Sequence, residues 1–239
     1  GAIAKSYYAE QHGIDKDDMV VVSVMPCTAK KFEAGRTEMD EDVDFVLTTR
    51  ELGRMVKEAG IDLVNLPEEN YDPMMGESTG AASIFGSSGG VMEAALRTSY
   101  ELITEEELEE LDFEPVRGTE GIKEAEVEIN GMTVKTAVAS GLSNVGQLLE
   151  KIKNGAQYHF VELMACPGGC IGGGGQPIPT NQEVVKNRMQ SIYEIDSGKK
   201  RRKSHQNKEV QKLYEDYLGE PNSHLAHELL HTNYIKREI

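Results

Sequence analysis

Residues Tyr158 to Pro177 read YHFVELMACPGGCIGGGGQP, an apolar run that leads into a glycine-rich loop containing Cys166 and Cys170. The third cysteine of the chain, Cys27, follows a second apolar run, Val20–Val24. Both runs end in Met-x-Cys. Because open α/β sheets bind ligands beyond the carboxyl ends of their strands, we expect the two strand ends to converge on one metal–sulfur centre.

Composition limits the classes of function. The 239 residues carry a formal net charge of −16, which argues against nucleic-acid and anionic membrane surfaces as partners. No stretch approaches the roughly 18 apolar residues of a membrane span. Three cysteines cannot all pair, which indicates a reducing compartment and thiols used as ligands. We therefore expect a cytoplasmic protein, with the periplasm as the alternative.

The order of predicted elements indicates an α/β fold. Met19–Val24 is a continuous β-branched run, typical of a strand buried on both faces. Glu124–Ile129 and the following MTVKTAVA flank Asn130-Gly131, a strong hairpin signal. Further strands are expected at Val43–Leu47 and Tyr158–Met164, and helices at 1–12, 28–34, 49–59, 91–102 and 143–152. We predict a mixed, largely parallel sheet flanked by helices, with an inserted β-hairpin and a helical C-terminal tail.

Three Thr-x-x-Glu sequences predict capped helix starts, at Thr48, Thr104 and Thr180. After Gly198 the composition changes, and the basic run Lys199–Lys203 opens a tail with two predicted helices. Such a run is usually solvated, and a docking patch for an acidic partner is the alternative. We predict a main domain at 1–198 and an extension at 199–239 that wraps it.

The cysteines favour a metal–sulfur site over other uses. Thiolates bind soft metals and iron–sulfur clusters, and a cubane is normally held by four of them. Only three are present, so either one iron lacks a protein thiolate or the fourth ligand lies upstream. Lys30 could donate a charge-assisted hydrogen bond to an anionic ligand, and Met25 and Met164 could pack around it.

Several alternatives compete with this interpretation. A Cys₃His zinc site could use His159 or a tail histidine, although the spacing fits no familiar zinc pattern. The histidines His224, His227 and His231 lie at helical spacing, where packing or capping is the commoner role. The segment Gly80–Gly90 could cradle an anion at a helix start, but it lacks the ending of a nucleotide P-loop.

The cysteine motifs resemble those of one known family. MPCTAKKFE (25–33) and MACPGGCIGGGGQP (164–177) resemble the second and third signatures of the catalytic H domain of iron-only (FeFe) hydrogenases. Residues 75–97 and 116–131 also resemble that domain, and 204–234 resembles its C-terminal extension, which is a separate small subunit in some members. The first signature, T-S-C-C-P, is absent, so the resemblance implies that Gly1 lies partway through the domain.

The resemblance implies a cofactor and roles for particular residues. The H-cluster of the family is a 4Fe–4S cubane bridged to a two-iron subcluster with carbonyl, cyanide and dithiolate ligands. By match, Cys27 and Cys166 would hold the cubane, and Cys170 would be shared with the two-iron unit. Lys30 would hydrogen-bond a cyanide. The remaining pocket residues implied by the match are Met25, Phe85, Gly86 and Met164.

The resemblance also implies an activity and partners. The chain would be part of an enzyme that interconverts hydrogen with protons and electrons. Its expected partners are the upstream half of the H domain and ferredoxin or a nicotinamide-linked electron-transfer subunit. The alternatives are a non-catalytic iron–sulfur assembly factor, whose relatives usually end in Trp where this chain has none, and a hydrogen sensor.

Overall fold

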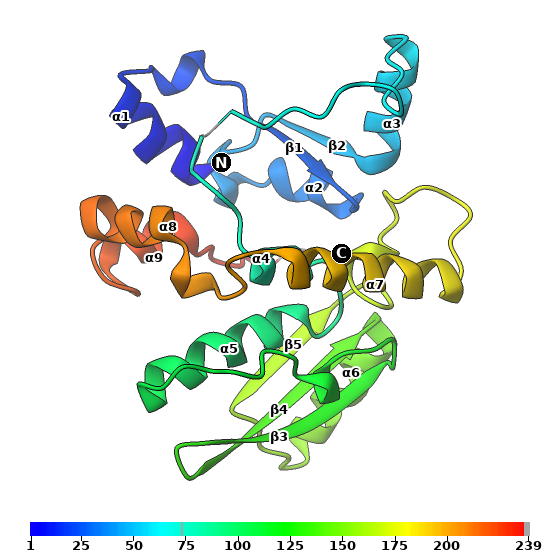
Figure 1. Cartoon of the computed structure of the whole chain (residues 1–239), viewed down its shortest axis with the longest axis vertical. Coiled ribbons are helices and arrows are strands. Elements are labelled where there is room, and N and C mark those ends of the chain that lie inside the picture. Colours follow the sequence, from blue (N-terminus) through cyan, green and yellow to red (C-terminus); the bar gives the residue numbers. More distant parts are fainter. Residues whose placement is uncertain (73, 237–239) are drawn as a thin grey trace. The chain divides into compact units, whose positions relative to one another are not determined.

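The computed structural model describes residues 1–72 and 74–236, which form two compact units. Of the described residues, the first unit contains 1–72, 74–77, 174–177 and 208–236, and the second contains 78–173 and 178–207. Figure 1 shows the helices and strands of each. The fold is α/β, as predicted, and the strands of the described residues lie in two small sheets. No helix in the described part of the chain is long and apolar enough to span a membrane.

The first unit contains a parallel pair of strands, β1 (Val22–Met25) and β2 (Phe45–Thr48). Helix α2 (Ala29–Ala34) follows β1, and α3 (Thr49–Glu58) follows β2. The expectation that the first strand is buried on both faces is wrong for these residues, because Val22 is 49% exposed and Val24 is 44% exposed. The reason is that β1 has only β2 beside it in the described sheet.

The tail of the chain packs on its first helix. A π-helical turn at Ala4–Tyr8 continues into α1 (Ala9–His12), which confirms the predicted helix end at residue 12, and Gly13 caps it in the left-handed conformation. The tail contains α8 (Lys208–Leu213), a π-helical turn at Tyr214–Leu218 and α9 (His224–Leu230). Its buried residues Leu213, Leu218 and Ala226 form an apolar cluster with Ile3 and Tyr7. The domain boundary predicted at residue 198 stays a prediction.

The second unit is built on a three-stranded sheet. The strands β3 (Ile122–Ile129) and β4 (Met132–Ser140) form the predicted hairpin, and β5 (Phe160–Met164) pairs parallel to β4. Asn130 and Gly131 both have positive φ, as a type I′ turn requires. Helix α5 (Gly90–Thr104) packs over one face of the sheet and α6 (Leu142–Lys153) over the other, as their apolar clusters show (Figure 1).

Two predicted helix starts in this unit are wrong. Thr104 begins no helix, because it is the last residue of α5 and its hydroxyl donates back to the carbonyl of Tyr100 at 2.8 Å. The last long helix, α7 (Gln182–Gly198), is capped by Asn181, whose side chain accepts from the amide of Val184 at 2.9 Å, and not by Thr180. A short helix, α4 (Gly80–Ile84), lies in the segment that the sequence predicts to be a glycine-rich turn.

The basic run Lys199–Lys203 is not simply solvated. Lys203 is only 4% exposed and pairs with Glu101. Arg202 lies 2.6 Å from Asp196, a carboxylate that is fully buried. These two residues of the run therefore tie the end of α7 to α5 through internal ion pairs, and the sequence pattern alone does not distinguish such pairs from a solvated edge.

Candidate functional site

The loop after β5 carries Cys166 and Cys170 and is folded by its own backbone. The amide of Gly169 donates to the carbonyl of Cys166 at 3.0 Å, and the amide of Gly173 donates to the carbonyl of Cys170 at 2.9 Å. Gly168 and Gly169 both have positive φ, which favours glycine. Cys166 is half-buried and Cys170 is exposed, and neither is in a disulfide. Both thiols thus lie on a tight, closely bonded loop.

Two backbone hydrogen bonds join this loop to the segment that follows α4. The amide of Ile171 donates to the carbonyl of Gly86 at 3.0 Å, and the amide of Ser88 donates to the carbonyl of Gly168 at 3.0 Å. A Cβ on Gly169 would lie 2.6 Å from the nitrogen of Ser88, so the two backbones are in direct contact. The structure therefore places the segment of the predicted pocket residues Phe85 and Gly86 next to the cysteine loop, within the second unit.

The predicted residues of the first unit follow β1. Met25 is its last residue, and Cys27 precedes α2 and is half-buried. The glycine run that continues the cysteine loop is bonded here, because the amide of Gly175 donates to the carbonyl of Pro26 at 3.0 Å. A Cβ on Gly175 would lie 2.9 Å from the nitrogen of Cys27. This position therefore requires glycine.

Arg50 holds the same glycine run from the start of α3. Its amide donates to the carbonyl of Gly175 at 3.1 Å, and its guanidinium donates to the carbonyl of Gly174 at 2.7 Å. No sequence motif predicts a role for Arg50, because an arginine near a helix start carries no specific signal. Its two hydrogen bonds fix the peptide segment that follows Cys170 along the chain.

Lys30 lies in α2 with its ammonium 2.7 Å from the carboxylate of Glu33. Its side chain is 44% exposed, so it stays accessible to solvent. Phe85 is 45% exposed, and Met164 is the last residue of β5. The roles assigned to these residues by resemblance, and the convergence of the two cysteine segments, stay predictions.

Two charged residues are buried in the three-stranded sheet whose last strand leads into the loop, and no sequence motif predicts a role for them. Lys123 on β3 and Glu162 on β5 are 7% and 6% exposed. Burial lowers the pKa of Lys123 to about 8. Burial also raises the pKa of Glu162, although the backbone amides of Gly89 and Met92 hydrogen-bond to it. The only sequence signal is that Glu162 is the one charged residue of β5, whereas Lys123 does not stand out, because β3 also contains Glu124, Glu126 and Glu128.

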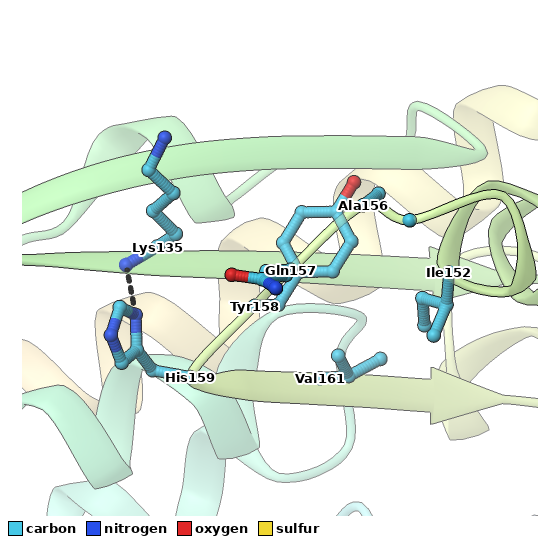
Figure 2. Close-up of a pocket in the computed structure, with 8 residues that line it drawn as sticks. Lys135, Ile152, Ala156, Gln157, Tyr158, His159 and Val161 are labelled. Carbon is cyan, nitrogen blue, oxygen red and sulfur yellow. Dashed lines mark hydrogen bonds between the residues drawn. The ribbon is translucent and has the colours of Figure 1, made fainter.

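The zinc alternative with His159 is not supported by the geometry. His159 precedes β5, and its ring accepts a hydrogen bond from the amide of Lys135 at 2.9 Å (Figure 2). Cys166 follows the other end of the same strand. A strand of this length separates its ends by about 15 Å, so the imidazole and the thiol cannot share a metal.

A cavity at that end of the strand is also remote from the cysteines. It has a volume of about 650 Å³ and is lined by Lys135, Tyr158, His159 and Val161, among others (Figure 2). The tail histidines His227 and His231 pack edge to face, with ring centroids 4.6 Å apart, which is the packing role expected of them. Neither this cavity nor the pair of tail histidines includes a cysteine.

The donor chemistry of the three thiols fits part of an iron–sulfur group. Thiolates are the ligands that iron–sulfur clusters use, and a cubane takes four of them. The chain supplies Cys27, Cys166 and Cys170. By residue type the three thiols match three of the four thiolates of a cubane, and their sharing of one cluster stays a prediction.

Two family models match this chain. Residues 1–174 match the family model of the iron only hydrogenase large subunit, C-terminal domain, and residues 182–237 match that of the iron hydrogenase small subunit. The NADP-reducing hydrogenase subunit HndD of Solidesulfovibrio fructosivorans is 52% identical over 243 residues, a match that covers 100% of this chain and 42% of HndD.

A solved structure and a more distant relative extend the comparison. A variant of apo [FeFe]-hydrogenase HydA1 from Chlamydomonas reinhardtii superposes with a TM-score of 0.80 at 44% identity, over 98% of this chain and 67% of that one. The cytosolic Fe-S cluster assembly factor narfl of Xenopus tropicalis is 31% identical over 98% of this chain and 51% of its own length. The chain thus spans 42% to 67% of the length of these proteins.

Proposed function

The chain belongs to the iron-only hydrogenase family, and on that premise we propose that it forms part of a catalytic domain that interconverts hydrogen with protons and electrons. The observation that carries the proposal is the set of backbone hydrogen bonds that the third signature, residues 164–177, makes with other segments. The loop of Cys166 and Cys170 is bonded to Gly86, and its continuation at Gly175 is bonded to Pro26, next to Cys27. These are the segments that the sequence motifs single out.

In this proposal each residue of the motifs has a distinct task. Cys27 and Cys166 hold the cubane, and Cys170 holds both the cubane and the two-iron subcluster. The H-cluster supplies the redox chemistry of hydrogen when it is bound. Lys30 provides a positive charge and a donor, and it must leave Glu33 to use them. The remaining pocket residues, which exclude water and shape the site, are Met25, Phe85, Gly86 and Met164.

We propose partners for a chain that spans about half the length of its curated relatives. The upstream half of the H domain would bring the fourth cubane thiolate, and the half-exposed valines of β1 offer an apolar surface to such a segment. HndD is named as a subunit of an NADP-reducing hydrogenase, which supports a nicotinamide-linked electron partner, with ferredoxin as the alternative. The reduced thiols support the cytoplasm as compartment, with the periplasm as the alternative.

The second candidate function is a non-catalytic iron–sulfur protein. It is supported by the 31% identity to the cluster assembly factor narfl. The match of residues 182–237 to the hydrogenase small subunit favours the catalytic function. A hydrogen sensor would share the catalytic site and differ in an attached signalling domain.

Activity together with infrared spectra separates the two main candidates. The chain is produced with the upstream segment of HndD, matured with the two-iron subcluster, and assayed for hydrogen evolution from reduced viologen. We expect hydrogen and the infrared bands of bound carbonyl and cyanide. A protein that binds iron and sulfide yet shows neither hydrogen nor these bands would be the assembly type.

Lys30 and its neighbour Lys31 provide a matched pair of variants. Lys31 is paired with Glu51 at 2.9 Å and has no assigned role at the cluster. We expect Lys30→Met to lower hydrogen evolution by about 10- to 100-fold, the usual effect of removing a group that supports metal ligands, and Lys31→Met to leave it within about twofold. Equal effects of the two variants would contradict the role of Lys30.

A further inference from the structure

Three residues lie side by side in one row across the sheet of the second unit. Lys123 on β3 pairs with Val138 on β4, which pairs with Glu162 on β5. Val138 belongs to the apolar cluster that packs against Met92 of α5, so the row faces α5. Two strand spacings, about 10 Å, separate the backbones of the two charged residues. They are buried charges that lie on either side of an apolar residue.

The two charges meet the same peptide group. The ammonium of Lys123 donates to the carbonyl of Ser88 at 2.9 Å, and the carboxylate of Glu162 accepts from the amide of Gly89 at 2.6 Å. That carbonyl and that amide belong to one peptide unit. Gly89 has a φ of 93°, and a Cβ there would lie 1.8 Å from the carbonyl oxygen of Val116. The peptide is therefore held at both ends in a conformation that only glycine allows.

Each charge is also satisfied by a second neutral partner. Lys123 donates to the carbonyl of Gly118 at 2.9 Å. Glu162 accepts from the amide of Met92 at 2.8 Å, in the first turn of α5, where the helix dipole favours a negative charge. Buried charges are unfavourable unless they are hydrogen-bonded in this way. Because both side chains bond to the Ser88–Gly89 peptide, the orientation of that peptide is their common effect.

This peptide connects directly to the cysteine loop. The amide of Ser88 donates to the carbonyl of Gly168, and the amide of Ile171 donates to the carbonyl of Gly86. We propose that Lys123 and Glu162 are positioning residues, which orient the Ser88–Gly89 peptide and thereby hold the loop of Cys166 and Cys170 in its ligand-binding geometry. The ligand-binding part of this proposal rests on the proposed function of the loop.

Hydrogen exchange tests the positioning in the 239-residue chain without any cluster. The variants are Lys123→Met and Glu162→Gln, of which the second keeps an oxygen acceptor and is the milder change. We expect amides in 86–92 and 166–173 to exchange about tenfold faster in Lys123→Met, because two buried carbonyls lose a charged donor. Glu162→Gln should change the same segments less, and α6 should not change in either variant.

An exposed ion pair between two strands of the same sheet is the matched control. Lys135 on β4 and Glu126 on β3 lie 3.0 Å apart and are both solvent-accessible. Lys135→Met and Glu126→Gln should leave the exchange of 86–92 and 166–173 unchanged. Unchanged exchange in the Lys123 and Glu162 variants would overturn the proposal, and so would an equal increase throughout the chain, since that would indicate general destabilisation.

The thiols provide a second readout that a general loss of stability would not imitate. We expect alkylation of Cys166 by a maleimide to become about tenfold faster in Lys123→Met, while that of Cys27 stays unchanged, because Cys27 lies outside the bonded loop. Equal acceleration at both cysteines would overturn the proposal. If Lys123→Met does not fold, the same comparison is made with Glu162→Gln.

A third readout concerns the metal–sulfur group. The chain and its variants are reconstituted with ferrous iron and sulfide, and bound iron and the electron paramagnetic resonance of the reduced product are measured. We expect lower iron content and an altered signal in Lys123→Met, and neither in Lys135→Met. If neither the unmodified chain nor the same chain produced with the upstream segment of HndD binds iron, the proposed function of the loop fails, whereas hydrogen exchange and alkylation still decide the positioning role.

Discussion

Glu51 links two helices of the first unit through one carboxylate. It accepts from the amide of Thr48 at 2.8 Å, which completes the predicted capping box, and its oxygen lies 2.9 Å from the ammonium of Lys31 in α2. The hydrogen bond from the Thr48 backbone, followed by that from Lys31, lowers the pKa of Glu51 from 4.5 to about 2. The ionised form is therefore the one that the folded chain stabilises.

This lowered pKa predicts a pH dependence of stability. A carboxyl whose folded pKa lies below its unfolded pKa stabilises the fold fully above the unfolded value and loses that contribution as pH falls. The difference in unfolding free energy between the unmodified chain and Glu51→Gln should be constant above about pH 5 and should shrink between 4.5 and about 2. Urea unfolding at several pH values measures it.

The control for this prediction lies at the other end of the same helix. Glu58 is in the last turn of α3, where the helix dipole disfavours a negative charge. Glu58→Gln removes a carboxylate outside the capping box, so it should not lower the unfolding free energy at neutral pH, where Glu51→Gln does. A Glu51→Gln difference that is independent of pH would show that the capping box contributes through its neutral hydrogen bonds alone.

At the residue scale, short sequence motifs predict which residues belong to the site, but they do not predict the buried charged residues that orient the peptide next to it. The cysteines and Lys30 lie in recognisable short motifs. Lys123 and Glu162 do not, because their relation depends on the register of three strands and on a peptide some 35 or more residues away. A charged residue in a strand is normally read as solvent-facing, and only the tertiary structure shows that these two are buried.

The β3–β4 hairpin and α6 show how glycine acts on a single element. Gly131 has a φ of 74° in the hairpin turn, and Gly146 lies in the interior of α6. A Cβ at either position would meet no atom within 4 Å. The effect of an added methyl group is therefore limited to backbone conformation, and it has opposite signs at the two positions.

These two glycines give a paired prediction. Gly131→Ala should lower the unfolding free energy by about 1–2 kcal/mol, because an L-residue is strained at positive φ. Gly146→Ala should raise it by about 0.5–1 kcal/mol, because alanine favours a helix interior. Urea unfolding followed by circular dichroism measures both. A stabilising Gly131→Ala would contradict the type I′ turn.

At the element scale the sequence predicts structure where the signal is local. The hairpin, α6 and the capping box of α3 each depend on neighbouring residues, and each is confirmed. Thr104 fails as a cap because its hydroxyl bonds back into α5. Helix α4 is missed because glycine is a poor helix former, and its buried residues Ala81 and Ile84 are what stabilise it.

At the scale of the whole molecule, residues near the N-terminus and residues of the C-terminal tail pack together in the first unit. The N-terminal helix, at residues 2–12, is too short to be stable alone in water. Its residues Ile3 and Tyr7 pack against the tail, and the rings of Tyr7 and Tyr217 lie 5.3 Å apart. The sequence predicts that the tail wraps the main domain but not which helix it covers, since that contact joins residues more than 200 positions apart.

Removal of the tail tests this dependence. A chain that ends at residue 207 lacks α8 and α9, so the apolar face of the N-terminal helix loses its cover. We expect amides of residues 2–12 to exchange at least about tenfold faster, while the hairpin at 122–140 keeps its protection. Addition of a separate 208–239 peptide should restore protection to residues 2–12, because the apolar cluster that covers Ile3 and Tyr7 requires no covalent link between the two segments. Unchanged exchange of residues 2–12 after truncation would contradict the apolar cluster as the source of their stability. Loss of protection in the hairpin as well would show that the two units unfold together.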